Sequence, residues 1–168
     1  MERRNALIVV DVQRGFLNEH TQPTLERIER LQRSFATVIV TRFVNPEGSS
    51  YERRMGSQRH RPVSEDCELA FSPVPYAIKL DKGTYGLRSH LGRVLELTED
   101  AEITLCGWDT DGCVLAIALE LFDAGKCVKI ASEACASSAG DAYHLVALDL
   151  LRRAVGVPFV ETDRRERV

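Results

Sequence analysis

Several features that would assign a chain to a specialised class are absent from this sequence of 168 residues. It lacks an excess of positive charge: the formal net charge is -3 and the sequence pI is about 5.8. That balance provides no positive field for a nucleic-acid partner. Long apolar runs are also lacking, since the first one is interrupted at Asp11 after about six residues, too short for a signal peptide or a membrane span. We therefore expect neither nucleic acid nor membrane as a partner.

Motifs for disulfides, metals and nucleotide cofactors are missing as well. The number of cysteines is odd, and no pair has CxxC spacing, so we interpret them as reduced, as in a cytoplasmic protein. They are Cys67, Cys106, Cys113, Cys127 and Cys135. Neither GxGxxG nor GxxxxGK occurs, which predicts no organic cofactor. The four histidines show no ligand spacing, so we predict no catalytic metal.

The composition is that of an ordinary globular domain. Hydrophobic residues make up 44% and charged residues 28%, close to the globular average. A chain of this length can bury roughly 70% of the surface that it exposes when unfolded. We expect a single domain over residues 1–168.

Short apolar runs alternate with helical patterns along the chain. The runs are typical of strands buried on both faces of a parallel sheet. The expected strands are Ala6–Val10, Ala36–Val40, Tyr76–Leu80, Glu102–Cys106, Cys127–Ala131 and Val157–Val160. The expected helices are Thr24–Phe35, Leu87–Leu97, a helix after Cys113 that ends at Gly125, and Ala142–Val155. This order predicts an α/β fold with three αβα layers and a six-stranded, mostly parallel, Rossmann-like sheet.

One long segment, Phe43 to Pro75, has the composition of a loop. It is rich in Gly, Ser, Pro, Arg and Glu. Because long loops in compact domains are usually functional, we expect this one to wall or cover a site.

Three residues whose side chains could take part in a reaction lie where a parallel sheet places its ligand site, beyond the carboxyl ends of the strands. Asp11 closes the first strand, Lys79 lies at the end of the third, and Cys113 opens the helix after the fourth. A helix N-terminus and an ammonium lower the pKa of a thiol. A carboxylate can take the thiol proton and return it to a leaving nitrogen. Taken singly, each residue has a commoner role: a cysteine is more often a small core residue, an aspartate at a strand end a cap, and a lysine a surface charge.

Four segments in one order and spacing carry a more specific signal. They are LIVVDVQRGFL, VIVTRFVN, AIKLDKGTYG and LCGWDTDGCVLAIALELFDAGKCVKIASEACASS. Together they resemble the isochorismatase-like cysteine hydrolase superfamily, which includes nicotinamidases and N-carbamoyl amidohydrolases. The most specific motif is Gly107, Thr110, Cys113 and Val114 before an Ala-rich helix.

The resemblance implies a catalytic triad of Asp11, Lys79 and Cys113. Lys82 is a rival for the cation, but the spacing from Lys79 to Gly83, Thr84 and Tyr85 favours Lys79 and makes Lys82 a loop cation. The resemblance also implies a non-proline cis peptide at Trp108–Asp109, and an oxyanion hole formed by the backbone amides of Asp109 and Cys113.

Five residues that flank the strand ends are candidate substrate-binding walls, with core packing or loop anchoring as the alternative. They are Phe16, Phe43, Asn45, Tyr85 and Trp108. The arginines of the long loop are candidates for carboxylate recognition, although a solvated, salt-bridged loop is the commoner outcome. They are Arg53, Arg54, Arg59 and Arg61.

The function that this resemblance implies is hydrolysis of a small amide, ureido or related C–N bond through a thioester on Cys113, in a homo-oligomer. Two alternatives remain open. One is a catalytically idle domain that binds a metabolite or a protein partner. The other is a redox role, in which Cys113 forms a sulfenic acid that a second cysteine, such as Cys106, resolves.

Overall fold

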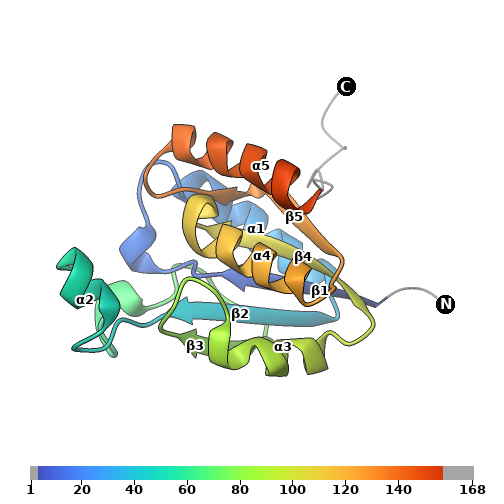
Figure 1. The fold of residues 1–168 in the computed structure, drawn as a ribbon, viewed down its shortest axis with the longest axis horizontal. Helices are drawn as coiled ribbons and strands as arrows, with labels where there is room; N and C mark the ends of the chain where they lie inside the picture. The colour runs from blue at the N-terminus through green and yellow to red at the C-terminus, as the bar shows by residue number, and fades with distance from the viewer. Residues whose placement is uncertain (1–3, 157–168) are drawn as a thin grey trace.

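The computed structural model describes residues 4–156, which build one sheet of five parallel strands (Figure 1). The strands are β1 (Arg4–Val10), β2 (Thr37–Phe43), β3 (Ile78–Lys82), β4 (Ala101–Trp108) and β5 (Val128–Ala136). Their order across the sheet is β3-β2-β1-β4-β5. The chain thus moves from β1 outward to β3 and returns on the other side of β1. This reversal places the switch point, where ligands bind in such sheets, between β1 and β4.

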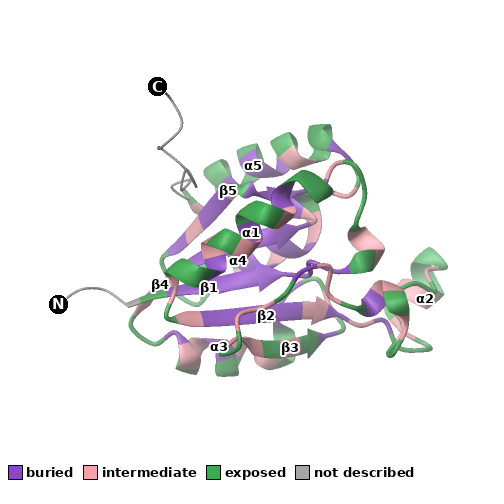
Figure 2. Cartoon of the chain, turned by 180° about the vertical axis from the view of Figure 1, so that it is seen from behind, coloured by how far each residue is buried: buried purple, intermediate pink, exposed green. Residues whose placement is uncertain are grey.

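Helices cover both faces of the sheet. The α-helices of the described residues are α1 (Leu25–Leu31), α2 (Ser50–Met55), α3 (Leu91–Leu97), α4 (Leu115–Asp123) and α5 (Asp141–Val155). α4 and α5 lie side by side over one face, and α1 lies on the opposite face (Figures 1 and 2). The predicted α/β fold with a parallel sheet is confirmed, with five of the six expected strands. The sixth, Val157–Val160, lies outside the described residues.

The core consists of the central strands and the helix faces packed on them. Residues 6–10 of β1 have no exposed surface at all, and β2 and β4 are buried over most of their length (Figure 2). Because helices shield both faces, an unbroken apolar run is stable there, whereas a strand with one wet face would alternate.

The third strand departs from the prediction. It runs over Ile78–Lys82, two residues later than expected, and its residues alternate between partly or fully buried and exposed. β3 pairs only with β2, so it is an edge strand of the described sheet and carries a weaker apolar signal. The shift makes Lys82 the last residue of the strand and moves Lys79 to its interior.

The segment predicted to be loop is mostly loop, but it contains α2. The Ser49 hydroxyl caps this helix by accepting a hydrogen bond from the Glu52 N–H at 3.1 Å, and Gly56 ends it with a φ of 66°. In Figure 1, α2 projects beyond the carboxyl ends of the strands. It therefore lies at the end of the molecule where the site was expected.

The turn that follows β4 depends on a glycine. Gly107 pairs with Val10 of β1 and has a φ of 123°. A Cβ at Gly107 would lie 2.2 Å from the carbonyl oxygen of Val10 and 2.6 Å from its nitrogen. Only a residue without a side chain fits between the two strands here.

We predict that Gly107→Ala destabilises the protein by about 2 to 5 kcal/mol, because it combines a backbone clash with a disfavoured φ. Gly92→Ala in α3 is the matched control, since a Cβ there meets nothing within 4 Å. It should leave stability unchanged or raise it by up to about 1 kcal/mol. Urea unfolding followed by circular dichroism measures both, and equal midpoints for the two variants would contradict the prediction.

Candidate active site

Asp11 stands directly after β1, with its carboxylate held in a buried position. The residue is 1% exposed and has a left-handed backbone, with a φ of 49°. Its N–H donates to the Thr41 carbonyl oxygen at 3.2 Å, and the Thr41 hydroxyl donates to Oδ1 at 2.7 Å. Thr41 belongs to β2, so the neighbouring strand fixes both the backbone and the side chain of Asp11.

Lys82 provides the cation that faces this carboxylate. Its Nζ lies 2.6 Å from Oδ2 of Asp11, and both side chains are only 1% exposed. The ammonium also donates to the carbonyl oxygens of Thr84 and Tyr85, at 2.9 and 3.1 Å. The ammonium thus has two carbonyl acceptors and a carboxylate counter-ion, which together offset the cost of burying it.

Cys113 completes the group from the turn after β4, which borders β1 on the side away from β2 and β3. It is 4% exposed and lies in a π-helical turn, Thr110–Val114, which leads into α4. Its thiol is within hydrogen-bonding reach of both the Asp11 carboxylate and the Lys82 ammonium. π-Helical turns are rare and frequently occur at functional sites.

The electrostatics of the group keep the thiol protonated at rest. Burial raises the pKa of Cys113 well above its ordinary value, the Asp11 carboxylate raises it further, and Lys82 opposes both. This differs from the lowered thiol pKa expected from the sequence, because desolvation outweighs the ammonium and the helix terminus. For Lys82, burial lowers the pKa, but Asp11 and Cys113 outweigh it and the net shift is upward, so the ammonium stays charged.

The prediction that Lys79 supplies the cation is wrong. Lys79 pairs with Val40 in the interior of β3, and it is exposed. Successive side chains of a strand point to opposite faces, so Lys79 and Lys82, three positions apart, point in opposite directions. Lys79 instead lines a pocket on the other face of the sheet, beside Arg42 and Asp81. The error follows from the two-residue shift of β3, which puts Lys82 and not Lys79 at the end of the strand. The position of Lys82 directly before Gly83 is the sequence feature that could have identified it as the buried cation.

The turn between β4 and Cys113 is built differently from the expectation. No peptide bond within residues 4–156 is cis, so the bond Trp108–Asp109 is trans. The chain turns instead through Asp109, which has a left-handed backbone with a φ of 56°. Its carbonyl oxygen accepts from the N–H groups of Gly112 and Val114, and its carboxylate accepts from the Ser138 N–H at 2.8 Å. The oxyanion role of the Asp109 and Cys113 amides stays a prediction.

Three of the five candidate wall residues join two others in a chain of ring contacts that we call the aromatic strip. In spatial order the strip consists of Phe16, His60, Phe43, Tyr51 and Tyr85. Consecutive ring centroids are 4.2, 5.7, 4.7 and 5.2 Å apart. The Phe43 ring also lies 5.7 Å from the Lys82 Nζ, so the strip borders the buried group. Tyr51 and His60, from the long loop, were not identified from the sequence.

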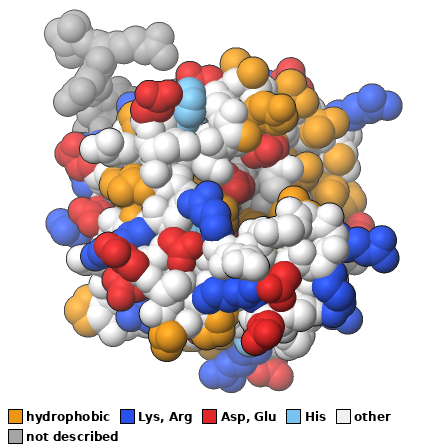
Figure 3. Space-filling view, turned by 90° about the vertical axis from the view of Figure 1, so that its left-hand side faces the viewer, with side chains coloured by type: hydrophobic (Ala, Val, Ile, Leu, Met, Phe, Trp, Pro, Cys, Tyr) orange, Lys and Arg blue, Asp and Glu red, His pale blue; other side chains and the backbone are white. Residues whose placement is uncertain are grey.

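Two surface pockets meet at the exposed end of this strip. One, of about 570 Å³, lies between α2 and residues 83–85. The other, of about 420 Å³, lies over the turn that carries Cys113 and is lined by Asp109, Gly112 and Leu115 among others. Tyr85, which is 46% exposed, lines both. Figure 3 looks onto this end of the molecule, where charged side chains of both signs surround the centre of the view.

The other two candidates, Trp108 and Asn45, do not line a site. Trp108 is fully buried in the core, and its indole N–H donates to the Thr24 hydroxyl at 2.8 Å. Asn45 is also fully buried, and its amide donates to the carbonyl oxygens of Ser57 and Arg59 at 3.0 and 2.9 Å. Both side chains are engaged in holding the fold, so their prediction as substrate contacts is wrong.

The loop arginines are structural where their contacts are described. Arg61 forms an ion pair with Glu52 at 2.5 Å, Arg53 donates to the Gly48 carbonyl oxygen, and Arg59 donates to the Gly15 carbonyl oxygen.

Within residues 4–156 no group of three or more His, Cys, Asp and Glu side chains is arranged to hold a metal ion. No helix in that part of the chain is long and apolar enough to cross a membrane.

A buried thiol, carboxylate and ammonium thus lie together at the carboxyl edge of a parallel α/β sheet, and such groups can support acid-base-assisted nucleophilic attack. The model of the Isochorismatase domain matches residues 5–163, and the chain belongs to this family.

Solved structures show the same fold. N-carbamoylsarcosine amidase from Thermoplasma acidophilum superposes with a TM-score of 0.82 at 20% identity, covering 98% of this chain and 99% of that one. A nicotinamidase/pyrazinamidase from Bacillus subtilis gives a TM-score of 0.83 at 21% identity, covering 94% and 100%. The mouse Isochorismatase domain-containing protein 2A is 39% identical over 100 residues, which are 60% of this chain and 40% of the mouse protein.

We predict that Lys82→Met destabilises the protein by about 3 to 5 kcal/mol, because it leaves the buried Asp11 carboxylate without its counter-ion. The matched control is Lys79→Met on the same strand, where an exposed substitution should change stability by less than about 0.5 kcal/mol. Chemical unfolding at neutral pH measures both free energies. A Lys79 variant as unstable as the Lys82 variant would contradict this assignment of the buried cation.

Proposed function

We propose that this protein is a cysteine-dependent hydrolase that cleaves the C–N bond of a small amide, ureido or related substrate through a thioester. The observation that carries the proposal is the contact of the Cys113 thiol with the buried Asp11–Lys82 ion pair. A nucleophile, a proton carrier and a fixed positive charge are the groups that such an acyl transfer needs. The family's structural neighbours include enzymes named as amidases and nicotinamidases, which supports a C–N bond as the target.

The first half of the reaction forms the thioester. Because burial keeps the thiol neutral, sulfur attacks the substrate carbonyl carbon only as Asp11 takes the thiol proton. Negative charge then develops on the carbonyl oxygen, and the backbone amides of Asp109 and Cys113 are the proposed donors to it. Donors of this kind are worth about 3 to 4 kcal/mol in the transition state. Asp11 passes its proton to the leaving nitrogen, the C–N bond breaks, and ammonia or an amine departs.

The second half releases the acid. Water attacks the thioester carbonyl while Asp11 takes one of its protons, and the carbon–sulfur bond breaks. The proton returns to sulfur, which restores the neutral thiol. Lys82 remains charged throughout, since its pKa is raised, and it stabilises the transient thiolate and holds Asp11 in place. No organic cofactor and no metal takes part in these steps.

Several parts of the sequence interpretation remain predictions. They are the single domain over residues 1–168, the cytoplasmic location and the homo-oligomeric state. The idle-domain alternative also remains, since Cys113 is only 4% exposed. For the redox alternative, Cys106 and Cys135 are buried on the sheet, with Cys135 3% exposed and Cys106 not exposed at all.

The test is an ammonia-release screen over small amides, ureido acids and hydroxamates, with Cys113→Ala as the blank. On the best substrate, Lys82→Ala should lower kcat/KM by at least about 100-fold, because Asp11 and the transient thiolate lose their counter-ion. Lys79→Ala should stay within about twofold of the wild type. Release of ammonia that the Cys113 variant matches on every substrate would favour the idle domain, and equal losses in both lysine variants would overturn the assigned triad.

A further inference from the structure

Exposed apolar side chains gather on the two neighbouring helices α4 and α5. Of the eleven large hydrophobic residues that are exposed within residues 4–156, six belong to these helices. They are Leu119, Phe122, Tyr143, Leu145, Val146 and Leu150. In Figure 3 hydrophobic side chains collect at the upper right, the side of the molecule on which α4 and α5 lie. A concentration of this kind on a soluble protein marks an interaction site more often than chance exposure.

The two helices carry rows of apolar residues that match in length. On α4 the row is Leu115, Leu119 and Phe122, and on α5 it is Tyr143, Val146 and Leu150. Steps of three or four residues keep each row on one side of its helix. In both rows the first and last residues are seven positions apart, so each row is about 10 Å long.

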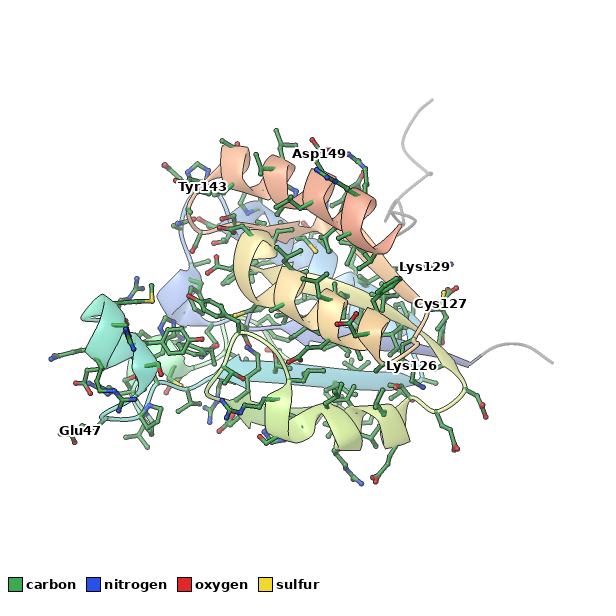
Figure 4. The ribbon with its side chains drawn as sticks, in the orientation of Figure 1. Glu47, Lys126, Cys127, Lys129, Tyr143 and Asp149 are labelled. Carbon is green, nitrogen blue, oxygen red and sulfur yellow. The ribbon has the colours of Figure 1, made fainter. Side chains whose placement is uncertain are left out.

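The rows form one surface because the helices lie side by side and run in the same direction (Figures 1 and 4). Each helix follows a strand of the parallel sheet, and the labelled Tyr143 marks the end of α5 where its row begins (Figure 4). Leu115 is half-buried, and the other five residues are 37 to 60% exposed. We call this surface the apolar face.

A charge of opposite sign stands at each end of the apolar face. Asp111 precedes Leu115 by four positions, and it lines the smaller pocket together with Leu115 and Leu119. Arg153 follows Leu150 by three positions, in the last turn of α5. Both residues are exposed, and neither side chain forms an ion pair within the described part of the chain. The acid thus lies before the α4 row and the base beyond the α5 row.

This arrangement is complementary to itself. When a second copy is turned so that its helices run antiparallel to those of the first, the α5 row of one copy lies along the α4 row of the other. The equal lengths then set Leu150 against Leu115 and Tyr143 against Phe122. Arg153 extends beyond the row to the Asp111 of the second copy, and a two-fold axis repeats every contact with the roles exchanged. Such a match between two parts of one chain favours a second copy as the occupant of the face.

We propose that the apolar face is a dimer interface, in which α5 of each copy packs antiparallel on α4 of the other and an Arg153–Asp111 ion pair closes each end. Burial of the rows, with the aromatic Phe122 and Tyr143 among them, supplies the affinity, and the charges at the rim set the orientation. The proposal goes beyond the proposed function and does not depend on it.

The dimer leaves the candidate active site accessible. The second copy borders the smaller pocket, since Asp111, Leu115 and Leu119 belong both to that pocket and to the interface. The larger pocket, between α2 and residues 83–85, is lined by no residue of α4 or α5, so it stays open to substrate.

The first test measures the mass of the full-length protein by light scattering after size-exclusion chromatography, over a range of concentrations. The wild type should have at least twice the 18.8 kDa mass of one chain. Val146→Glu, which puts a charge in the middle of the α5 row, should reduce that mass by at least half. Val63→Glu is the matched control, because Val63 is fully exposed in the long loop, and it should leave the mass unchanged. Melting curves followed by circular dichroism show that each variant is folded.

The second test exchanges the charges at the ends of the face. Asp111→Arg and Arg153→Asp should each raise the dissociation constant of the dimer by at least about tenfold, because each places like charges together at both ends. Mixed in equal amounts, the two variants should recover most of the wild-type affinity, since both ends of the mixed dimer again join opposite charges. Sedimentation equilibrium measures the three dissociation constants.

Three results would overturn the proposal. A wild type that is monomeric at every concentration would leave the face to residues 157–168 of the same chain or to a different protein. A mass that Val146→Glu does not lower would place the interface elsewhere, and a mixture that stays as weak as its components would exclude the antiparallel register. None of these results bears on the triad, which the ammonia screen tests.

Discussion

The ion pair between Asp11 and Lys82 is the interaction on which the candidate active site depends. It joins the ends of β1 and β3, which are not neighbours in the sheet. Thr41, of the intervening strand β2, donates a hydrogen bond to the same carboxylate. Three adjacent strands therefore end in one network, and the turn after β4 adds Cys113 to it. Burying two charges is costly, and it is stable only where geometry and further hydrogen bonds are as complete as they are around Lys82.

The same burial sets the chemistry. A thiol in water-poor surroundings stays protonated, so reactivity has to arise from the contact with Asp11 at the moment of attack and not from a standing thiolate. The chain is also constrained on both sides of the site: Asp11 and Asp109 have left-handed backbones, and Gly107 fits against Val10 only because it lacks a side chain. Strain and close packing at these points hold three side chains from distant parts of the sequence in contact.

The sequence predicted the buried strands well, because a short apolar, β-branched run such as Ala6–Val10 is typical of a strand buried on both faces. Asp11 was placed directly beyond the first such run and Cys113 at the start of the helix after the fourth, where the structure has both, and their catalytic roles stay predictions. The prediction of Lys79 as the cation was wrong because β3 is an edge strand. Its sequence, IKLDK, alternates between apolar and charged residues, so the pattern does not show where the strand begins and ends. Trp108 and Asn45 were wrong because position near a strand end does not reveal the direction of a side chain. His60 was missed, because only the folded loop brings it to Phe16 and Phe43.

The central claim is that Asp11 and Lys82 act as one buried unit. A double-mutant cycle with Asp11→Asn and Lys82→Met, measured by urea unfolding at neutral pH, tests it most directly. The account predicts a coupling free energy of about 2 to 3 kcal/mol, with the double variant clearly more stable than the sum of the single losses implies, because each single variant leaves an unpaired buried partner. Additive losses, within about 0.5 kcal/mol, would contradict it.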